Sequence, residues 1–264
     1  MMPLNEAPLE MLAGIRVVMT DIDDTISTDG KLRPEAFDAL WQLHDAGLIV
    51  IPVTGRPAGW CDHIARFWPV DAVVGENGGF YFYHDGRKLR RQFFYDERKR
   101  REDRQRLEKI RDTILREVPG CNVASDQGYR EYDLAIDFCE DVEPLPREAV
   151  LRIKRIFEEA GAQAKISSIH VNGWFGQFDK LSMVRRCLLE LFGMDVDAQN
   201  DVLAICGDSP NDESLFRSFR NSFGMANIVD FADLLEYPPA YITTQRGGGG
   251  FREVADSILR ARRA

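Results

Sequence analysis

Three short apolar stretches, each leading directly into charged or hydroxyl-bearing residues, restrict the possible folds of this chain most. Residues 15–20, 48–53 and 202–206 are rich in Val, Ile and Leu, and polar or Gly-Asp sequences follow each of them. Runs of this length and composition predict strands that are buried on both faces. Residues 34–47 carry apolar side chains at helical spacing and end at a glycine, so the chain begins with a strand, a helix and a strand.

The same alternation continues outside the middle of the chain. Residues 72–74 predict a fourth strand, and residues 60–67 and 180–192 predict helices. Strands that alternate with helices form a parallel sheet with helices on both sides. We therefore expect an α/β fold, a doubly wound Rossmann-like core made of residues 1–84 and 177–264.

Residues 85–176 have a different pattern, which predicts an inserted α+β domain. The expected elements are a very polar helix at residues 97–117, strands at 122–123 and 132–138, and a second helix at 146–160. Two more strands are expected within residues 164–175. Apolar and polar residues alternate in the strands, which is typical of an antiparallel sheet with one face in water. The basic stretch at residues 87–106 is laced with acidic residues, and we interpret it as a solvated helix face.

Composition excludes several classes of partner. The formal net charge of -9 disfavours nucleic acid, which needs a cationic surface. No apolar run approaches the roughly 18 residues of a membrane span, and the start lacks the pattern of a signal peptide, so we expect a cytoplasmic protein. The 5 cysteines are scattered without metal-binding spacing, which favours reduced thiols over disulfides or zinc. Oligomeric state is not readable.

Polar residues suited to phosphate and a metal ion follow the predicted strands. In a doubly wound sheet the carboxyl ends of the strands form the binding crevice. The three sequences that end there are Asp21-Ile22-Asp23-Asp24-Thr25, Thr54-Gly55-Arg56 and Gly207-Asp208-Ser209-Pro210-Asn211-Asp212. Their order and placement predict one shared site, although each motif alone also suits a turn or a helix cap.

These residue types can transfer a phosphoryl group. Asp21 can attack phosphorus, and Asp23 can protonate the leaving group and then activate water. Asp21 and Asp208 offer the hard oxygen ligands that Mg²⁺ prefers. Thr54, the amide of Gly55 and a lysine would balance the charge of a phosphate, and Lys180, at the start of the helix after the insert, is the candidate lysine.

The four motifs together resemble those of the haloacid dehalogenase superfamily of phosphatases. An insert between the second and third motifs is similar to the type IIB cap of the Cof-type, sucrose-phosphatase and mannosyl-phosphoglycerate phosphatase enzymes. Residues 76–79, Glu-Asn-Gly-Gly, resemble the Asn-Gly loop of that subgroup. One departure is Asp24, where many Cof-type members have Gly. Asp-Asp-Thr is similar to sucrose- and trehalose-phosphatase sequences, which favours a sugar phosphate.

The resemblance implies a role for each matching residue. It makes Asp21 the nucleophile and a magnesium ligand, and Asp23 the acid/base that offers its backbone carbonyl to the metal. Asp208 is implied as the second metal carboxylate. Thr54 and Lys180 are implied to hold the phosphoryl oxygens, and Asn211 and Asp212 to orient the metal's waters and the phosphate, with Asp212 counted among the metal-site residues. We add Gly55, Arg56 and Asn77 as substrate-binding residues, and we expect a small phosphorylated metabolite as the substrate.

Other functions are compatible with part of the pattern. A phosphomutase shares the aspartyl-phosphate and differs in the acceptor of the phosphoryl group. A receiver-like signalling domain uses related groups, but its acidic pair is adjacent and it needs no insert. Dehalogenation needs neither magnesium nor a second acid at Asp23.

Substrate choice is expected to lie in the insert. Arg130, His170, Asn172 and Trp174 would face the core if the sheet of the insert closes over the site, with Arg130 and His170 as substrate ligands. For His170 and Trp174 the alternatives are an ordinary strand residue and simple packing. Residues 247–250, all glycine, are either a plain loop before the last helix or a loop that borders the entrance.

Overall fold

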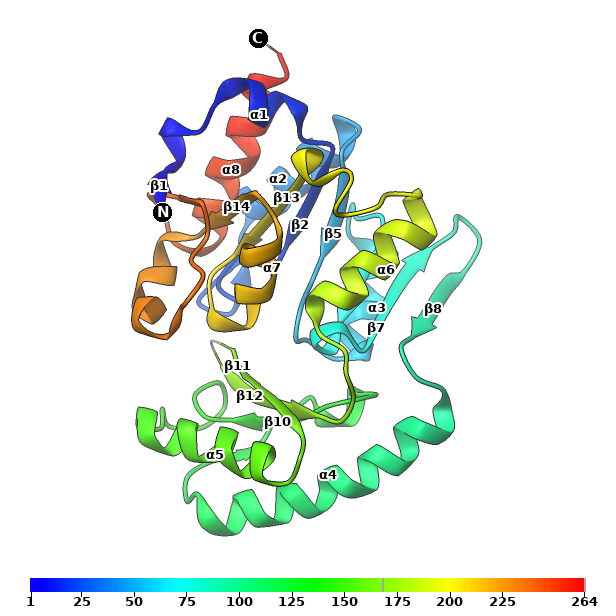
Figure 1. Cartoon of the computed structure of the whole chain (residues 1–264), viewed down its shortest axis with the longest axis vertical. Helices are drawn as coiled ribbons and strands as arrows, with labels where there is room; N and C mark the ends of the chain where they lie inside the picture. The colour runs from blue at the N-terminus through cyan, green and yellow to red at the C-terminus, as the bar shows by residue number, and fades with distance from the viewer. Residues whose placement is uncertain (168, 264) are drawn as a thin grey trace.

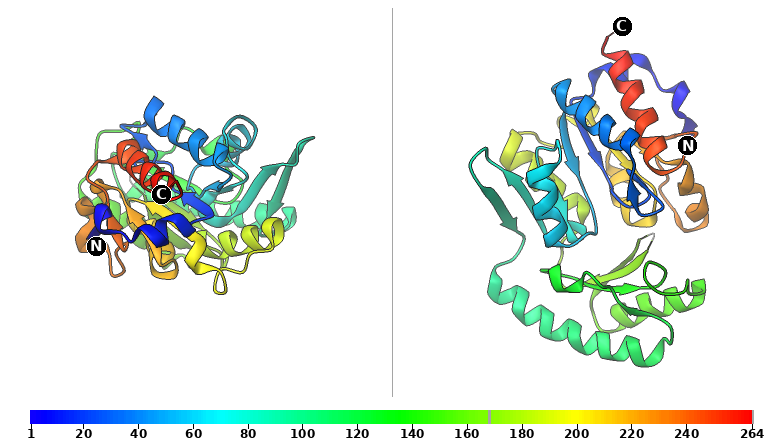
Figure 2. Two further views of the ribbon diagram at one scale, coloured as in Figure 1. Left: turned by 90° about the horizontal axis from the view of Figure 1, so that it is seen from above. Right: turned by 180° about the vertical axis from the view of Figure 1, so that it is seen from behind.

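The computed structural model describes residues 1–167 and 169–263. Figure 1 shows an α/β core that carries both termini, and a smaller body below it that is built from the middle of the chain. The two bodies face each other across the carboxyl ends of the core strands, also when the molecule is seen from behind (Figure 2). Among the described residues, none of the helices combines the length and apolar character needed to cross a membrane.

The core is built on a six-stranded sheet whose paired strands are all parallel. In spatial order its strands are β1 (Met2–Pro3), β15 (Tyr241–Ile242), β14 (Asn221–Gly224), β13 (Leu203–Gly207), β2 (Val17–Thr20) and β5 (Ile49–Pro52). The three predicted apolar stretches therefore lie side by side as β13, β2 and β5. This confirms the predicted α/β fold with a parallel sheet.

Alternation along these strands explains why both faces are covered. In β2, Val18 packs into one apolar cluster, whereas Val17 and Met19 pack into another on the opposite face. The first cluster is covered by α1 (Leu9–Gly14), α2 (Pro34–Asp45), α3 (Ala58–Phe67) and α8 (Gly247–Ala261). The second is covered by α6 (Lys180–Phe192) and α7 (Glu213–Ser218). The sheet is thus buried on both sides, as its continuous apolar runs require.

A three-stranded antiparallel sheet extends the core beside β5. It contains β6 (Val73–Gly75), β7 (Phe80–His84) and β8 (Leu89–Phe93), and β6 contacts the main sheet through a parallel bridge between Val53 and Val74. The predicted boundary at residues 84–85 falls in the hairpin between β7 and β8. Because β8 pairs with β7, residues 89–93 lie beside the core, not in the second body.

The second body is an antiparallel sheet backed by two helices. Its strand order is β11 (Gln163–Ile166), β12 (His170–Trp174), β10 (Leu134–Asp137) and β9 (Asn122–Val123), and α4 (Glu97–Glu117) and α5 (Arg147–Glu159) cover one face. Leu134, Ile136 and Val171 pack against these helices in a separate apolar cluster. The alternating pattern predicted one face in water, whereas His170 and Asn172 were expected to face the core if the sheet closes over the site. Both are only 2% exposed, because this face lies against the core.

Short elements complete the chain. A small hairpin pairs β3 (Ser27–Thr28) with β4 (Lys31–Leu32). The 3-10 turns are Leu4–Glu6, Glu76–Gly78, Gln127–Tyr129, Asn200–Val202, Pro210–Asp212 and Ala226–Leu234. The glycines at 247–250 are the first turn of α8, not a loop. A Cβ on Gly248 would lie 2.7 Å from the carbonyl oxygen of Ile26, so glycine lets this helix start against the residues that follow Asp21.

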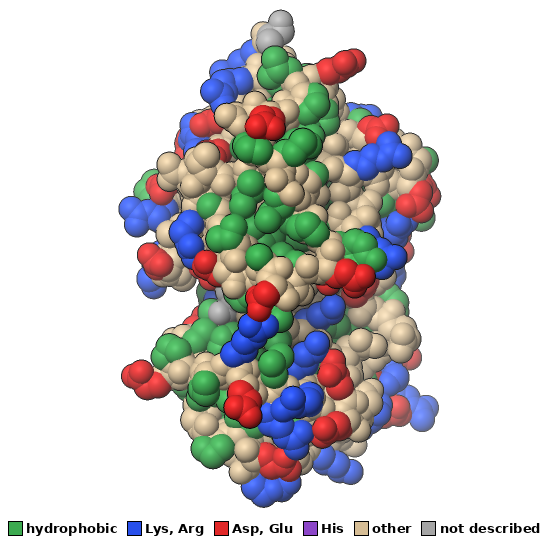
Figure 3. All heavy atoms as spheres, turned by 60° about the vertical axis from the view of Figure 1, so that its left-hand side comes forward, with side chains coloured by type: hydrophobic (Ala, Val, Ile, Leu, Met, Phe, Trp, Pro, Cys, Tyr) green, Lys and Arg blue, Asp and Glu red, His purple; other side chains and the backbone are tan. Residues whose placement is uncertain are grey.

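The two bodies differ in the side chains that they expose on the face drawn in Figure 3. Apolar side chains gather over the upper part, the core, while Lys and Arg lie interspersed with Asp and Glu over the lower part. Within residues 87–106, the exposed ion pairs of Arg98 with Glu102 and of Arg101 with Glu97 agree with the interpretation as a solvated helix face.

Candidate active site

Three buried carboxylates meet at the carboxyl ends of β2 and β13. Asp21 and Asp208 directly follow these neighbouring strands, and Asp212 ends the 3-10 turn Pro210–Asp212. One oxygen of each lies within 4.8 Å of the others. Buried carboxylates this close repel one another unless a cation is present. An all-oxygen donor set of this kind fits a hard divalent cation.

Lys180 supplies a fixed positive charge to the same cluster. Its Nζ lies 3.1 Å from Oδ2 of Asp21 and 2.7 Å from Oδ1 of Asp212, and its side chain is 1% exposed. Burial lowers the pKa of Lys180, but the two facing carboxylates outweigh this and raise it above its ordinary value. Burial raises the pKa of Asp21 to about 7, against the opposing effect of Lys180. Lys180 therefore stays charged beside the predicted nucleophile.

Lys180 is held there by the Asn-Gly loop. It begins α6, whose capping residue Asp179 accepts from the amide of Ser182 in a capping box. Gly78, with a φ of 106°, packs so closely that a Cβ would lie 2.0 Å from the carbonyl oxygen of Asp179. Only glycine suits this backbone and this contact, so the loop at residues 76–79 sets where α6 begins.

Asp208 is oriented by two side chains, one from the first predicted motif and one that was not predicted. Thr25 donates its hydroxyl to Oδ1 of Asp208 at 2.9 Å, and Asn227 donates its amide to Oδ2 at 3.2 Å. Asn227 also donates to the carbonyl oxygen of Asp24 at 2.9 Å. Sequence reasoning missed Asn227, because it follows β14, a strand that was not predicted.

Asp24 occupies a position where the backbone favours glycine. Its φ is 53°, in the left-handed region that Gly adopts freely and that Asp tolerates better than most residues. The departure from Gly at this position therefore keeps the same turn after Asp21.

The second motif forms a loop beside Asp21. Thr54 accepts the amide of Arg56 on its Oγ1 at 3.0 Å, which leaves its hydroxyl hydrogen available to another acceptor. The side-chain amide nitrogen of Asn77 is buried and has no hydrogen-bond partner among the described residues. A Cβ on Gly55 would lie 3.3 Å from that nitrogen. Thr54 and Asn77 thus provide unused donors, which suit an anion.

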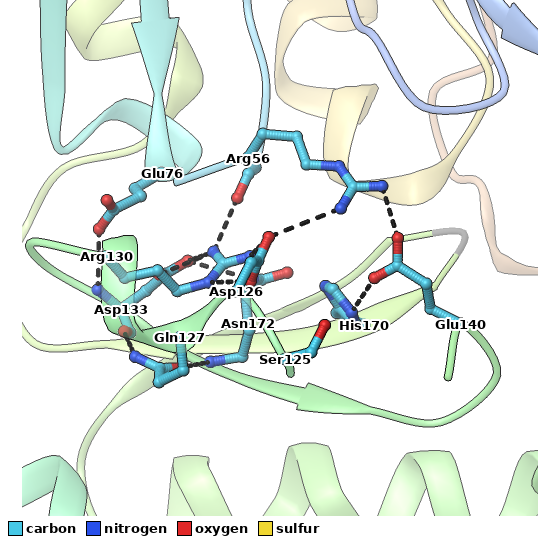
Figure 4. A network of polar contacts seen from close by, with 12 residues as sticks. Arg56, Glu76, Ser125, Asp126, Gln127, Arg130, Asp133, Glu140, His170 and Asn172 are labelled. Carbon is cyan, nitrogen blue, oxygen red and sulfur yellow. Dashed lines mark hydrogen bonds and ion pairs between the residues drawn. The ribbon is translucent and has the colours of Figure 1, made fainter. Parts of the chain in front are cut away.

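Arg56 joins the core to the insert through acidic residues. Its guanidinium binds both oxygens of Asp23, with an Nη2 to Oδ1 distance of 2.8 Å, and Nη2 also lies 2.8 Å from Glu140 of the insert. Glu140 in turn lies 2.9 Å from Nε2 of His170, as Figure 4 shows. The contacts with His170 and then Arg56 lower the pKa of Glu140 to about 2. Glu140 was not predicted, because no motif surrounds it.

Asp23 was expected among the metal-binding residues, but its carboxylate faces Arg56. The buried acidic cluster consists of Asp21, Asp208 and Asp212. A contribution of Asp23 to a metal site through its backbone carbonyl stays a prediction.

The expected substrate ligands of the insert have different surroundings. Asn172 donates to Asp133 at 2.8 Å. Trp174 is 2% exposed, stacks on Phe178 and donates Nε1 to its carbonyl oxygen at 3.1 Å, so it belongs to the packing. Arg130 is likewise buried in ion pairs with acidic neighbours.

A small cavity joins the two bodies at this place. It is lined by Asp21, Asp23, Gly55, Arg56, Arg130, Ser167, Ile169, His170, Asn172 and Asn211. Of the residues predicted to bind substrate, Gly55, Arg56, Arg130, His170 and Asn211 line this cavity, whereas Thr54, Asn77 and Lys180 do not. The cavity has a volume of about 10 Å³, room for about one water molecule. The two bodies lie close together in this structure.

Comparisons with known proteins agree with this geometry. Residues 18–100 match the family model of haloacid dehalogenase-like hydrolases. The chain is 27% identical over 254 residues to phosphoglycolate phosphatase 1 of Saccharolobus solfataricus, covering 93% of this chain and 96% of that protein.

Solved structures share the fold over nearly the whole chain. A protein of Thermoplasma acidophilum has a TM-score of 0.70 at 19% identity, with 93% of this chain and 98% of that one covered. The sucrose-phosphatase of Synechocystis sp. PCC6803, solved with sucrose and phosphate, has a TM-score of 0.63 at 17% identity, with 92% and 97% covered.

Proposed function

The chain belongs to the haloacid dehalogenase-like hydrolases, and from this premise we propose that it is a magnesium-dependent phosphatase that forms an aspartyl-phosphate on Asp21. The observation that supports this most is the buried cluster of Asp21, Asp208 and Asp212 with Lys180 at 3.1 Å from the proposed nucleophile. The cluster and Lys180 lie where an α/β sheet presents its ligands.

The proposed reaction has two displacement steps. Asp21 attacks phosphorus, the bond from phosphorus to the ester oxygen breaks, and Asp23 gives its proton to the leaving alkoxide. Water then attacks the phosphorus of the aspartyl-phosphate, its proton passes to Asp23, and phosphate is released. Lys180, Thr54 and Asn77 would hold the phosphoryl oxygens, and Asp21, Asp208 and Asp212 would hold Mg²⁺, which would neutralise their charge and that of the phosphate.

Arg56 must release Asp23 before this residue can act as an acid. Both carboxylate oxygens of Asp23 accept from the guanidinium in this structure. An incoming phosphate is itself a bidentate partner for arginine. We propose that Arg56 turns from Asp23 to the substrate, and that the released carboxylate of Asp23 takes a proton from the solvent before the transfer.

The insert at residues 85–176 acts, in this proposal, as a cap that closes over the phosphate site, with β8 remaining on the core. Support comes from the contact of Glu140 with Arg56, which itself binds Asp23, and from the contact of His170 with Glu140. Closure would exclude water from the acyl phosphate.

For the substrate we propose a small phosphorylated metabolite, with a sugar phosphate as the first candidate. The motif Asp23-Asp24-Thr25 and the sucrose-phosphatase fold relative support this choice. Phosphoglycolate is a second candidate, because a relative over most of the chain is named for that substrate. A sugar phosphomutase would use the same cluster with a different acceptor.

The test is a screen of phosphorylated metabolites, including sugar phosphates and phosphoglycolate, scored by phosphate release with and without magnesium. We expect release that requires magnesium and that is lost when a chelator is added. Transfer of the phosphoryl group between positions of a sugar without release would instead identify a mutase. Absence of turnover on every class, with the protein folded, would remove the proposal.

A further inference from the structure

A second set of contacts joins the core and the insert, and it does not involve Glu140 or His170. Glu76, on the Asn-Gly loop of the core, is fully buried and accepts the backbone amides of Glu131, Tyr132 and Asp133 from the insert at 2.5 to 3.2 Å. It also accepts the amide of Ala58 at 3.0 Å. Four amides on one buried carboxylate fix the insert at residues 131–133 to the core.

The backbone of this loop is strained, which shows that its surroundings determine it. Glu76 and Asn77 both have positive φ, 44° and 53°. A non-glycine residue in this region costs of order 1 kcal/mol or more and persists only where other contacts impose it. The amides of residues 131–133 on Glu76 are such contacts.

Arg130 crosses the same boundary in the opposite direction. It belongs to the insert, and its Nη1 donates to the carbonyl oxygen of Gly55 in the core at 2.8 Å (Figure 4). The same nitrogen donates to Asp133 at 2.9 Å, and Nε and Nη2 donate to Asp126 at 3.2 and 3.1 Å. Its side chain is 1% exposed. The guanidinium is thus occupied by protein acceptors on each nitrogen.

The Gly55 carbonyl belongs to a peptide unit that also carries a contact of Thr54. A peptide unit is planar, so the carbonyl of Gly55 and the amide of Arg56 turn together. Arg130 holds the carbonyl, and the amide of Arg56 donates to Oγ1 of Thr54 at 3.0 Å. Because both ends of this peptide unit are held, the amide of Arg56 always binds the same lone pair of Thr54 Oγ1. The hydroxyl hydrogen of Thr54 must then point in another direction, which fixes where it can donate.

We infer that Arg130 is a positioning residue for the phosphate-binding loop, acting through the Gly55–Arg56 peptide on the hydroxyl of Thr54, and that it does not contact the substrate itself. This inference rests on the proposed function, because it assigns Thr54 to the phosphoryl group. It also changes the sequence-based expectation, in which Arg130 selects the substrate. A residue that acts on the phosphate-binding loop affects every phosphate ester alike.

The test compares Arg130→Lys with the matched cap variant Arg152→Lys, whose arginine pairs with Glu117 and Glu159 at the surface. Lysine keeps the charge facing Asp126 and Asp133 but cannot reach three acceptors with one planar fork. The measurements are the inhibition constant of inorganic phosphate, kcat/KM on an aryl phosphate and on the best metabolite, and magnesium affinity without substrate.

We expect Arg130→Lys to raise the inhibition constant of phosphate about tenfold, which corresponds to about 1.4 kcal/mol. We expect both values of kcat/KM to fall by a similar factor, while the magnesium affinity of Arg130→Lys stays close to that of wild type. The Arg152→Lys variant should match wild type in all of these measurements. In the background of Thr54→Val, which removes the hydroxyl, Arg130→Lys should add less than about threefold, because the two changes act on one contact.

Different results would identify which part is wrong. Full additivity with Thr54→Val, or a loss on the metabolite alone, overturns the positioning role and returns Arg130 to substrate selection. If wild type binds no phosphate in the presence of magnesium, the proposed function fails and this inference fails with it. Should Arg130→Lys not fold, Asp133→Asn, which weakens one anchor of Arg130, must raise the phosphate constant and show the same non-additivity, or the inference is wrong.

Discussion

The core and the insert place polar groups in buried positions by different means. In the core, Asp21 and Asp208 follow directly after buried strands, and the order of the sheet brings them together. In the insert, Arg130, Asp133 and Glu140 are brought to the boundary by side-chain contacts with each other and with the core. Groups at strand ends can be read from sequence, whereas groups placed by mutual contacts cannot.

The comparison also divides the insert itself. Residues 130–133 are fixed to the core through Glu76 and Gly55. Glu140, which pairs with His170, contacts Arg56, whose guanidinium has to turn in the proposed reaction. A cap with one fixed and one exchangeable contact would open about the fixed one. We therefore expect the core to carry the chemistry, residues 130–133 to support it, and the region of Glu140 to select the substrate.

The largest effect is expected for Asp21→Asn. This change keeps the shape but removes the nucleophile, and removing such a group costs on the order of 10⁴-fold or more in kcat. Steady-state phosphate release with the best substrate measures it, with Asp201→Asn, an exposed residue paired with Arg220, as the control. Substantial turnover by a folded Asp21→Asn protein would contradict the role of the core.

A smaller and selective effect is expected for Asp23→Asn. Loss of the general acid should slow hydrolysis of an alkyl phosphate by about 10² to 10⁴-fold. An aryl phosphate, whose leaving group needs little protonation, should lose far less. The ratio of the two rates is the measurement, and equal losses on both esters would remove the acid/base assignment.

Changes at the exchangeable contact should alter substrate choice more than chemistry. Glu140→Gln and His170→Gln should reorder the kcat/KM values among metabolites, because His170 lines the cavity and Glu140 pairs with it. Activity on a small aryl phosphate should stay within about tenfold, or about 1.4 kcal/mol in the barrier. If both esters lost activity equally and magnesium affinity also fell, Glu140 and His170 would belong to the catalytic centre.

The smallest effect is a pH-dependent contribution of Glu140 to stability. Its contacts with His170 and Arg56 lower its pKa to about 2 in the folded state, from an ordinary value of 4.5. A carboxyl whose folded-state pKa is lowered stabilises the fold above its ordinary pKa, and this contribution is lost as the pH falls toward the folded-state value. After screening by solvent we expect about 1 kcal/mol.

Urea unfolding of wild type and Glu140→Gln measures this contribution as a difference in the free energy of unfolding. The difference should be present at about pH 6 and shrink at about pH 3.5. A difference that stays constant or grows on acidification would show that Glu140 is not held as an ionised carboxylate.

The sequence predicted the residues that follow strands or begin helices of the core, but not those placed by long-range side-chain contacts. The parallel sheet was predicted because its strands are continuous apolar runs, and Lys180 was expected near the site because it begins the helix after the insert. Asn227 was missed, since it reaches Asp24 across 203 residues of sequence without any motif.

The insert shows why polarity alone misleads. Alternation in its strands predicted one face in water, and only closure of the sheet over the site would place His170 and Asn172 against the core. That face is buried against the core, and Asn172 pairs with Asp133 there. Alternation indicates that two faces differ, but it does not say what covers the polar one. The glycines at 247–250 likewise begin α8, because packing against Ile26 overrides their weak helix propensity.

The most direct test of the proposed chemistry is to trap the intermediate. Wild type would be mixed with its best substrate and magnesium, quenched with borohydride, which reduces an acyl phosphate to an alcohol, and analysed by peptide mass spectrometry. We predict homoserine at position 21, dependent on substrate and magnesium and absent from the Asp21→Asn protein. Reduction at another carboxylate, or none at Asp21 while phosphate release continues, would contradict the assignment of the nucleophile to the core.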